Sequence, residues 1–258
     1  MTTRAIVVNF RTPDLTSAAV ASVLSDDPSA EVVVVDNESG DGSSDRLRGE
    51  WPNGAIEVID AGANLGFGQG VNLGSRGATV DALLVLNSDA RVRRGAIAAM
   101  TTALQDDPTL GLVAPHVVHP DNTQQVDAFG AFPTLANMLL RTNRAPSDAD
   151  SPDWVSGVGF LVRRSAFEAV GGFDEGFWMY FEDIDLCRRL RGAGWSIRRV
   201  REATIEHLKG ASRVTSASQA RQYAQSQRRY LERAGYSRSV VGTVAALRRP
   251  VDWYRGRG

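Results

Sequence analysis

Residues 31–43 read EVVVVDNESGDGS, an unbroken run of valines that ends in an acidic turn with two glycines. A short run that is apolar at every position is typical of a strand buried on both faces, as in a parallel sheet. Similar runs occur at residues 5–10, 56–59 and 82–86, and stretches of helical periodicity lie between them. This alternation predicts an α/β fold with a mostly parallel central sheet flanked by helices.

The second half of the chain is less regular. Strands are predicted at residues 111–118 and 157–163, and residues 196–208 predict either one long strand or a pair of strands. Residues 144–153 show no periodicity and predict a mobile loop. The sequence therefore predicts a regular first half followed by a more variable second half.

Composition and charge narrow the class of protein. The 258 residues carry a net charge of −1, which gives no global field that would attract nucleic acid. Cys187 is the only cysteine, so the chain can form no internal disulfide, and its place in an apolar helical stripe predicts burial. The N-terminus lacks the apolar run of a signal peptide, and no stretch reaches the roughly 20 apolar residues of a membrane span. These features predict a cytoplasmic protein.

Acidic residues follow two of the predicted strands. Asp36 directly follows the valine run, and Asp89 follows the strand at residues 82–86 after two intervening residues. In parallel sheets, ligands bind outside the carboxyl ends of the strands. The loop after residues 5–10 ends at the same edge, so we expect a ligand site there.

The glycine-rich segment at residues 64–74 reads NLGFGQGVNLG. A dinucleotide-binding fingerprint requires glycines at relative positions one, three and six. Starting from Gly66 or Gly68, the sixth position is Val71 or Leu73, so the fingerprint is absent. The chain also lacks the G-x-S-x-G turn of a serine hydrolase. The segment is interpreted either as a loop that brings backbone close to a ligand or as a flexible surface turn.

Residues 179–195 read MYFEDIDLCRRLRGAGW and place three carboxylates ahead of an apolar helical stripe. Acidic residues in a first helical turn favour the helix dipole, which accounts for one or two of them. If the helix begins near Asp183, this side chain shares a face with Leu186 and Leu190 and points toward the ligand site. Asp185 lies about 200° away around the axis and is interpreted as a structural or dipole partner.

Together these segments resemble family 2 glycosyltransferases of the GT-A fold, and within them the rhamnosyltransferase-like group. The matching blocks run in the family's order from about Ile6 to Arg213 and are VVNF, VVVVDNESGDGS, NLGFGQGVNLG, LLVLNSDA, GVGFLVRRSAFEAVGGFDEGFWMYFEDIDLCRRLRGAGW and HLKGAS. The long block is very specific, whereas the glycine block alone is weak. The resemblance implies a GT-A catalytic domain over residues 1–213, with a nucleotide-sugar half at about 1–115 and an acceptor half at about 116–213, and a C-terminal helical and basic extension over residues 214–258.

The resemblance also implies a donor site and a metal site. Donor binding falls to Val8, Asn9, Phe10, Asp36, Asn64, Gly66, Phe67, Asn72, Asn87 and Asp89. Asp89 takes the place of the last aspartate in the family's D-x-D metal motif, which reads Asn87-Ser88-Asp89 here and lacks its first carboxylate. One carboxylate, the donor diphosphate and water still suffice to hold Mg²⁺ or Mn²⁺, with His207 as a further ligand. Without a metal, Lys209 and Arg213 would have to stabilise the leaving group.

The resemblance assigns catalysis to the Glu182-Asp183 pair, with Asp183 as the base. Transfer with inversion needs a carboxylate that takes a proton from the acceptor hydroxyl. Trp178 and Tyr180 are expected on the acceptor side, either as a platform for apolar sugar faces or as core residues.

The expected activity is inverting transfer of a sugar, L-rhamnose from dTDP-L-rhamnose above others, to a hydroxyl of a glycan or polyprenyl-linked acceptor in cell-envelope polysaccharide synthesis. One alternative is a sugar-phosphate nucleotidylyltransferase. That enzyme would need a glycine- and arginine-rich phosphate loop after the first strand, which residues 9–15, NFRTPDL, do not supply. The other alternative is a non-catalytic nucleotide-sugar or carbohydrate-binding domain, and the presence of both Asp89 and Asp183 argues against it.

The C-terminal extension begins with a Gln-, Arg- and Tyr-rich helix predicted at residues 217–234 and closed by Gly235. Residues 238–258 then carry five arginines against one aspartate, together with a short apolar face and the aromatic pair Trp253-Tyr254. Such a segment either makes peripheral contact with anionic lipid at the inner face of a membrane or packs on the catalytic domain.

Overall fold

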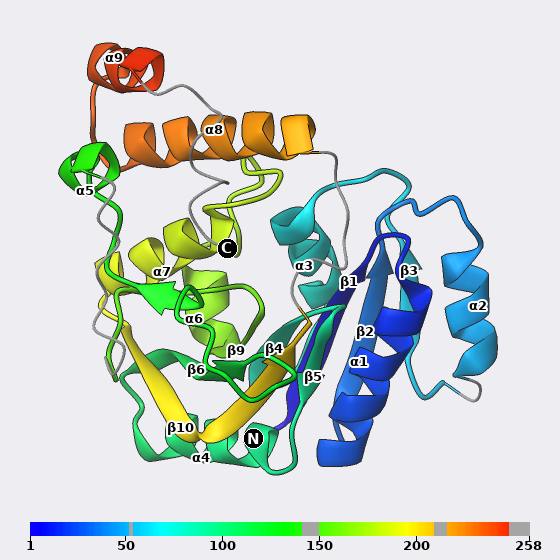
Figure 1. Cartoon of the computed structure of the whole chain (residues 1–258). Coiled ribbons are helices and arrows are strands. Elements are labelled where there is room, and N and C mark those ends of the chain that lie inside the picture. Colours follow the sequence, from blue (N-terminus) through cyan, green and yellow to red (C-terminus); the bar gives the residue numbers. More distant parts are fainter. Residues whose placement is uncertain (52–53, 141–149, 209–215, 248–258) are drawn as a thin grey trace.

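An eight-stranded sheet lies at the centre of the part of the chain that the structure describes, in the order β3-β2-β1-β4-β9-β6-β10-β5 (Figure 1). The computed structural model describes residues 1–51, 54–140, 150–208 and 216–247. The strands of this sheet are β1 (Thr3–Asn9), β2 (Glu31–Asp36), β3 (Glu57–Asp60), β4 (Ala82–Asn87), β5 (Ala90–Val92), β6 (Leu110–Val118), β9 (Gly159–Arg163) and β10 (Ser196–His207). A separate antiparallel pair consists of β7 (Phe129–Gly130) and β8 (Trp154–Val155).

Helices lie on both faces of the sheet and above one end of it. They are α1 (Pro13–Asp26), α2 (Ser43–Glu50), α3 (Phe67–Ser75), α4 (Ala96–Asp106), α5 (Leu135–Leu140), α6 (Arg164–Ala169), α7 (Glu182–Gly192), α8 (Ser216–Arg233) and α9 (Arg238–Leu247). The apolar residues of α1, α2 and α4 share one buried cluster with the sheet, and those of α3, α6 and α7 share another. The sheet is therefore covered on both faces.

The sheet is mostly parallel, as the sequence predicts. Strands β3, β2, β1 and β4 are parallel neighbours, and β10 is parallel to β6. Strand β9 runs antiparallel between β4 and β6, and β5 runs antiparallel at the edge beside β10. This mostly parallel sheet with helices on both faces agrees with the α/β fold that the sequence predicts.

The valine run of β2 confirms the prediction of burial on both faces. Val32 and Val34 belong to the cluster beneath α1, α2 and α4. Val33 and Val35 face the opposite side, where their side chains lie against Gly74 of α3. Each face of this strand thus meets a helix.

The interpretation of the glycine-rich segment as a loop or flexible turn is wrong beyond Gly66, because its remainder forms α3. A Cβ atom at Gly74 would lie 2.6 Å from Ile6 Cγ2, and one at Gly70 would lie 3.0 Å from Val8 Cγ2. These glycines, one helical turn apart, let α3 pack directly on the sheet. Close packing of a helix on the sheet overrides the low helix propensity of glycine.

The structure settles the alternative that the sequence left open for residues 196–208. Residues 196–207 form one long strand, β10, with a register shift between Val200 and Thr204. Helix α1 begins at Pro13 after Thr12, and the Thr12 side chain makes no capping hydrogen bond. The predicted mobile loop falls largely on residues 141–149, which lie outside the described residues.

The C-terminal helices pack on the second half of the chain. Tyr230 and Leu231 of α8 and Val241 of α9 are buried in a third apolar cluster with Phe177, Phe181 and Ile184. Gly235, which closes α8, has a φ of +93°. The predicted extension therefore shares a core with α7. Figure 1 shows α8 lying over α7.

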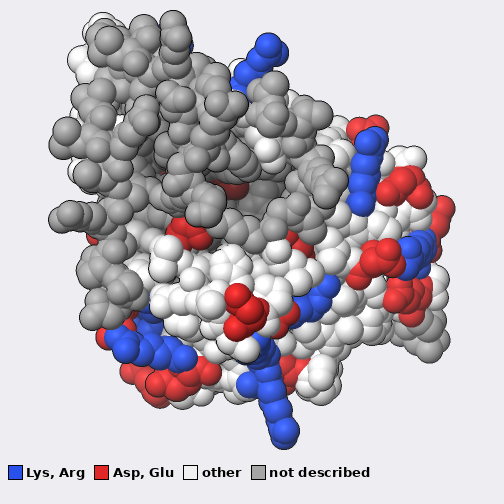
Figure 2. Space-filling view, viewed as in Figure 1, with Lys and Arg blue, Asp and Glu red and all other residues white. Residues whose placement is uncertain are grey.

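The surface of the described residues carries charges of both signs. On the face shown in Figure 2, acidic and basic side chains are mixed, in keeping with the net charge of −1. Within the described ranges, no helix combines the length and the apolar character needed to span a membrane. Residues 248–258, with Trp253 and Tyr254, lie outside the described residues.

Candidate active site

The carboxyl ends of β1, β2 and β4 meet at one edge of the sheet, as expected from their parallel register. Asn9 pairs with Asp36 across β1 and β2, and Val8 pairs with Asn87 across β1 and β4. The residues that follow these three strands therefore lie together and form one side of the candidate donor site.

Asp36 is almost fully buried and holds the loop that follows β2. Its Oδ2 accepts hydrogen bonds from Asn9 Nδ2 at 2.6 Å and from Ser39 Oγ at 2.7 Å, and its Oδ1 accepts one from Ser39 N at 2.9 Å. A carboxylate has about four acceptor positions, so roughly one remains on Oδ1. Asp36 thus has a structural role, and its predicted contact with the donor nucleoside is limited to that remaining position.

Arg11 lies in the loop that follows β1 and is a charged residue that the sequence patterns did not single out. Its backbone N–H donates to Ser39 Oγ and its Nε donates to the Ser39 carbonyl, both at 2.9 Å. The guanidinium lies 5.1 Å from the centre of the Phe10 ring. An exposed cation is therefore held beside Phe10 at the end of β1.

The donor-side and acceptor-side segments are joined at Gly66 and Trp178. Phe67 N donates to the Trp178 carbonyl, and Trp178 Nε1 donates to the Asn64 carbonyl, both at 3.1 Å. A Cβ atom at Gly66 would lie only 1.9 Å from the Trp178 oxygen, and Gly66 has a φ of +81°. Only glycine fits this crossing, which explains one glycine of the segment without invoking a ligand.

Asn72 and Phe67 lie in the packing between α3 and the second half of the chain. Asn72 Oδ1 accepts from Phe173 N at 2.8 Å, and its Nδ2 donates to the Phe173 carbonyl at 2.9 Å. The Phe67 ring meets the Phe173 ring edge-on at 6.1 Å and lies against Gly157. Backbone atoms of Phe173 thus engage both polar atoms of the Asn72 amide, and its place on the nucleotide side stays a prediction.

The turn after β4 carries Asp89 to the end of β10. Ala90 pairs with His207 across β5 and β10, and the Leu208 N–H donates to the Asp89 carbonyl at 3.0 Å. Asp89 Oδ1 lies 3.1 Å from His207 Nε2, and both side chains are nearly buried. The structure thus brings together the two residues predicted as metal ligands from 118 positions apart in the sequence.

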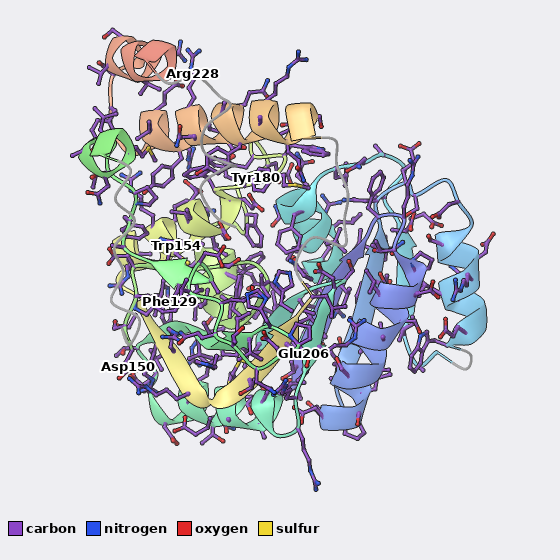
Figure 3. The ribbon with its side chains drawn as sticks, viewed as in Figure 1. Phe129, Asp150, Trp154, Tyr180, Glu206 and Arg228 are labelled. Carbon is purple, nitrogen blue, oxygen red and sulfur yellow. The ribbon has the colours of Figure 1, made fainter. Side chains whose placement is uncertain are left out.

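Arg91 supports the turn that carries Asp89. Arg91 Nη1 donates to the Ser88 carbonyl at 3.2 Å and to the Ala90 carbonyl at 2.8 Å. Burial lowers the pKa of Arg91, and the negative charges of Asp89 and Glu206 oppose that shift. Figure 3 labels Glu206 near the end of β10. Arg91 therefore holds its guanidinium against the turn at Asn87-Ser88-Asp89.

Asp89 and His207 suit a divalent cation. Two neighbouring ligands of an octahedral cation with bonds of about 2.1 Å stand about 3 Å apart, which matches their separation. Among the described residues, no group of three or more His, Cys, Asp or Glu side chains is placed to hold a metal. A cation here would therefore complete its coordination with oxygen atoms of the donor diphosphate and water. Lys209 and Arg213, the predicted alternative to a metal, lie outside the described residues.

A buried glutamine stands behind His207. Gln125 Oε1 lies 2.9 Å from His207 Nδ1, and Gln125 Nε2 donates to the His207 carbonyl at 2.9 Å. The same Nε2 lies 3.1 Å from His119 Nδ1. Sequence patterns gave no signal for Gln125, because its role depends on a contact with a residue 82 positions away.

The acidic pair lies at the first turn of α7, which begins at Glu182. Asp183 is half-buried, and its Oδ2 accepts a hydrogen bond from Gly157 N at 3.0 Å. Glu182 is 6% exposed, and its Oε2 has no hydrogen-bond partner among the described residues. Burial, and then the charge of Asp183, raises the pKa of Glu182 to about 8. Burial also raises the pKa of Asp183, while the Gly157 amide opposes the shift. A carboxylate with a raised pKa is a stronger base.

The backbone just ahead of the acidic pair is strained and held by α8. Tyr180 and Phe181 have φ values of +68° and +67°, a region that residues with side chains seldom adopt. Ser226 Oγ donates to the Met179 carbonyl at 2.6 Å, and the Tyr223 ring packs on both aromatic rings. Tyr180 therefore lies beneath α8 (Figure 3), which favours packing over an open sugar platform.

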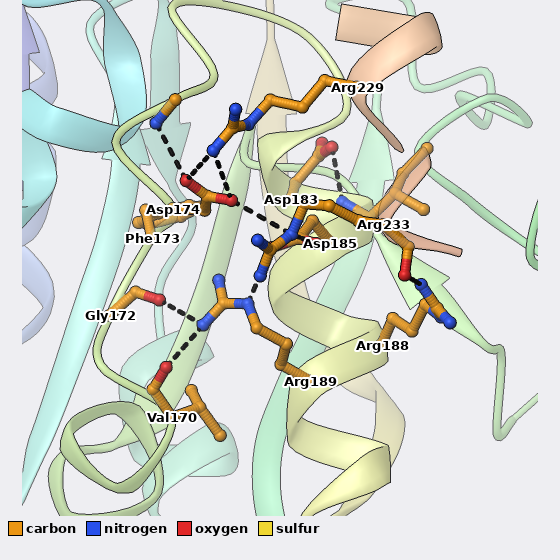
Figure 4. A network of polar contacts seen from close by, with 12 residues as sticks. Val170, Gly172, Phe173, Asp174, Asp183, Asp185, Arg188, Arg189, Arg229 and Arg233 are labelled. Carbon is orange, nitrogen blue, oxygen red and sulfur yellow. Dashed lines mark hydrogen bonds and ion pairs between the residues drawn. The ribbon is translucent and has the colours of Figure 1, made fainter. Parts of the chain in front are cut away.

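Asp185 has the structural role that the sequence predicted. It is 1% exposed and lies between Arg189 Nε at 2.7 Å and Arg233 Nε at 3.0 Å (Figure 4). Arg233 also contacts Asp174 at 3.0 Å, and Arg229 contacts Asp174 at 2.8 Å. This ion-pair cluster ties α8 to α7 and to the loop that precedes it.

Two further residues behave as structural groups. Cys187 is fully buried, and burial raises the pKa of its thiol to about 12, so it is unreactive. His116 lies 3.3 Å from an Arg199 guanidinium nitrogen, and burial followed by the Arg199 charge lowers its pKa. Neither has a part in the candidate site.

One dipeptide connects the acidic pair to the Asp89 turn. Gly157 N donates to Asp183, and the carbonyl of the next residue, Val158, accepts a hydrogen bond from Asn87 N at 3.0 Å. The predicted base and the end of β4, which leads into the Asp89 turn, are therefore each one hydrogen bond away from Gly157-Val158.

The chain is similar in sequence and in fold to known proteins. A family model described as "Glycosyltransferase like family 2" matches residues 2–248. The N-acetylglucosaminyl-diphospho-decaprenol L-rhamnosyltransferase of Mycobacterium tuberculosis is 32% identical over 209 residues, which cover 70% of this chain and 67% of the relative.

Two solved structures share the fold. A mannosyltransferase from Pyrobaculum calidifontis, in complex with GDP-Man and Mn²⁺, aligns over 95% of this chain and 69% of its own, with a TM-score of 0.66 and 18% identity. GalNAc-T7, crystallised with UDP, GalNAc and Mn²⁺, aligns over 80% of this chain and 43% of its own, with a TM-score of 0.60 and 19% identity. The chain thus spans less than half the length of the second structure.

Proposed function

This chain belongs to the glycosyltransferase-like family 2, and from that membership we propose that it is an inverting sugar transferase that moves L-rhamnose from dTDP-L-rhamnose to a hydroxyl of a lipid-linked glycan. The sugar and the acceptor class are those suggested by the name of the mycobacterial relative, and the dTDP carrier is the one implied by the resemblance to rhamnosyltransferases. Family membership also argues against the alternative of a sugar-phosphate nucleotidylyltransferase.

The connection through Gly157-Val158 is the observation that supports the proposal. Asp183 and Asn87, the last residue before the Asp89 turn, are each one hydrogen bond away from this dipeptide. Asp183 takes the proton of the acceptor hydroxyl while that oxygen forms a bond to the anomeric carbon. The bond from this carbon to the donor diphosphate breaks on the opposite face, and the nucleoside diphosphate leaves with the electron pair. Attack opposite to the leaving group inverts the anomeric configuration.

The environment of the acidic pair suits this role. Hydrogen bonds from Gly157 N to Oδ2 at 3.0 Å and from Ile184 N to Oδ1 at 2.8 Å fix the orientation of the Asp183 carboxylate. Glu182, with its pKa raised to about 8, is held neutral near pH 7 and adds no second negative charge beside the base. Asp183 can then ionise without repulsion from its neighbour.

Asp89 and His207 would hold Mg²⁺ or Mn²⁺ on the leaving-group side. When bound, the cation neutralises charge that grows on the diphosphate as the glycosidic bond breaks. Arg91 braces the turn that carries Asp89, and so keeps this carboxylate in place.

Incubation of the purified protein with a panel of nucleotide sugars and a short-chain polyprenyl-diphosphate N-acetylglucosamine tests the proposal. We expect dTDP-L-rhamnose to be consumed and the product to carry rhamnose with the anomeric configuration opposite to that of the donor, as measured by mass spectrometry and NMR. Exhaustive chelation should abolish transfer, and added Mn²⁺ or Mg²⁺ should restore it. Transfer from a different sugar nucleotide would contradict the donor, retention would contradict the mechanism, and full activity after chelation would contradict the metal.

A further inference from the structure

Gln125 lies in the loop between β6 and β7 and is 3% exposed. Its backbone is held at both ends, because Gln125 N donates to the Val117 carbonyl at 2.9 Å and the Gln125 carbonyl accepts from Ala128 N at 3.3 Å. The side chain therefore projects from a rigid part of the loop. Every polar atom of its amide meets a partner on His207 or His119.

These contacts determine which way the amide points. The backbone carbonyl of His207 can only accept a hydrogen bond, so the atom 2.9 Å from it must be the amide nitrogen of Gln125. The second proton of that nitrogen points to His119 Nδ1 at 3.1 Å. The amide oxygen is left facing His207 Nδ1 at 2.9 Å, and an oxygen in this position accepts a proton.

The orientation of the amide in turn determines the tautomer of His207. A hydrogen bond to the Gln125 oxygen requires that Nδ1 carries a proton, so the other nitrogen, Nε2, presents its lone pair in the neutral ring. Nε2 faces Asp89 Oδ1 at 3.1 Å. In the neutral ring these two acceptors repel each other, and either a proton on Nε2 or a metal cation between them removes the repulsion. The pair therefore has a geometry that can hold a cation between the two atoms.

We propose that Gln125 is a positioning residue that holds His207 in its Nδ1–H tautomer, with Nε2 directed at the cation site shared with Asp89. This inference rests on the proposed function, since it deepens the description of the same metal site. Residues that orient a ligating histidine through its other nitrogen typically change metal affinity by about 10- to 100-fold when they are removed. Among the described residues, the hydrogen bonds of the Gln125 side chain go to His207 and His119 and not to the acidic pair or a predicted donor residue. Loss of this side chain therefore acts on the site through His207.

The tautomer can be measured without metal and without turnover. Long-range ¹H–¹⁵N NMR spectra of the metal-free protein distinguish the two nitrogens of each imidazole. We expect His207 to show the Nδ1–H tautomer in the wild-type protein and to lose this preference in Gln125→Leu. A wild-type His207 in the Nε2–H tautomer would overturn the proposal, and this result does not depend on whether any variant folds.

Metal affinity supplies the second readout. We expect Mn²⁺ binding in the presence of a nucleoside diphosphate, followed by electron paramagnetic resonance, to weaken by about 10- to 100-fold in Gln125→Leu. Gln125→Glu keeps an oxygen that accepts from Nδ1–H but loses the nitrogen that donates to the His207 carbonyl, so it should keep the tautomer. Val126→Ala is the matched control, because Val126 is the next residue of the loop and is 67% exposed. Equal affinities of the wild-type protein and Gln125→Leu would overturn the proposal.

Different results would overturn the role of Gln125 and the proposed metal site. If the wild-type protein binds Mn²⁺ and transfers sugar while His207 is in the Nε2–H tautomer, only the role of Gln125 is overturned. If the wild-type protein transfers sugar at full rate after chelation, the metal part of the proposed function falls, and the role of Gln125 falls with it.

Discussion

Glu182 and Asp183 are adjacent in sequence, yet their surroundings give them different chemistry. Asp183 has an amide donor at 3.0 Å from Gly157, whereas one oxygen of Glu182 is buried with no hydrogen-bond partner among the described residues. A carboxylate that receives a hydrogen bond is stabilised in its ionised form, and one buried without a partner is stabilised as the neutral acid. One turn of helix thus offers a base and a neutral acid.

We expect Asp183→Asn to abolish transfer while leaving the fold and donor affinity intact. The asparagine oxygen can still accept the hydrogen bond from Gly157 N, but it cannot take a proton from the acceptor. General base catalysis contributes about 10²- to 10⁴-fold, so kcat should fall by at least that range. Comparison of kcat with the donor Kd checks this prediction. Glu202→Gln, which changes an exposed carboxylate on β10, is the control. A rate close to that of the wild type would exclude Asp183 as the base.

We expect Glu182→Gln to stabilise the protein increasingly as the pH rises from about 4.5 to about 8. The folded-state pKa of Glu182 is about 8, above the usual value of 4.5, so the folded protein binds this proton more tightly than the unfolded chain does. Folding stability therefore decreases with pH across this window in the wild-type protein, and glutamine removes that loss. Below the window both states are protonated, and the two proteins should differ little.

Thermal unfolding at pH 4, 6 and 8.5 measures this difference. The gain in Tm of Glu182→Gln should be largest at pH 8.5 and smallest at pH 4. A gain that does not change with pH would show that Glu182 has an ordinary pKa in the folded protein.

At the scale of elements, the structure separates what local sequence can predict from what it cannot. The valine run of β2 and the neighbouring strands were predictable, because burial on both faces requires apolar residues at every position. Their ends marked Asp36 and Asp89, since parallel strands bring their carboxyl ends to one edge. These features depend on residues that lie close together in the chain.

Helix α3 and Gln125 were not predictable, because their causes lie far away in sequence. Gly74 faces Ile6, and Gly66 faces the Trp178 carbonyl, so the reason for each glycine is a distant atom. The role of Gln125 likewise depends on His207. A weak signal for α3 existed in the spacing of Gly70 and Gly74, one helical turn apart, but no local pattern marks Gln125.

Helix α8 supports the strained turn and contributes to the ion-pair cluster. Substitution of Arg233 tests this support. In Arg233→Met, the nearly buried Asp185 keeps Arg189 but loses its second cation, and Asp174 loses one of its two. Removal of one partner of a buried charged group costs about 1–3 kcal/mol, and the partial exposure of Arg233 places the effect toward the lower end.

Urea unfolding measures the change in the free energy of unfolding. Arg228→Met on the same helix is the matched control, because Arg228 pairs with Glu232 at the surface, where the expected change is within about 0.5 kcal/mol. Equal stabilities of the two variants would show that the cluster in Figure 4 adds nothing to the attachment of α8.

At the scale of the whole molecule, α9 bears on the two interpretations of the basic C-terminal segment. Val241 is 2% exposed and belongs to the cluster shared with α8, whereas Val240 is 41% exposed. Part of the apolar face is thus already covered by the protein, which favours packing over insertion into lipid.

We therefore expect the full chain and a chain that ends at Gly235 to co-sediment equally and weakly with phosphatidylserine vesicles at moderate salt. The arginines of residues 238–258 should increase sedimentation only at low ionic strength, where their charges are less screened. Strong sedimentation of the full chain alone at moderate salt would favour peripheral attachment to the membrane instead.

The position of β9 has a consequence for how the protein assembles during synthesis. Residues 159–163 lie between β4 and β6 in the sheet, although both of those strands precede them in the chain. A nascent chain that has completed β6 cannot yet join this strand to β4, so both carry open edges that can pair with other chains. Residues 1–115 therefore cannot complete their part of the sheet before residues 159–163 are made, and a cut between residues 115 and 116 should give two insoluble fragments. The donor and acceptor halves predicted from the sequence thus belong to one folding unit.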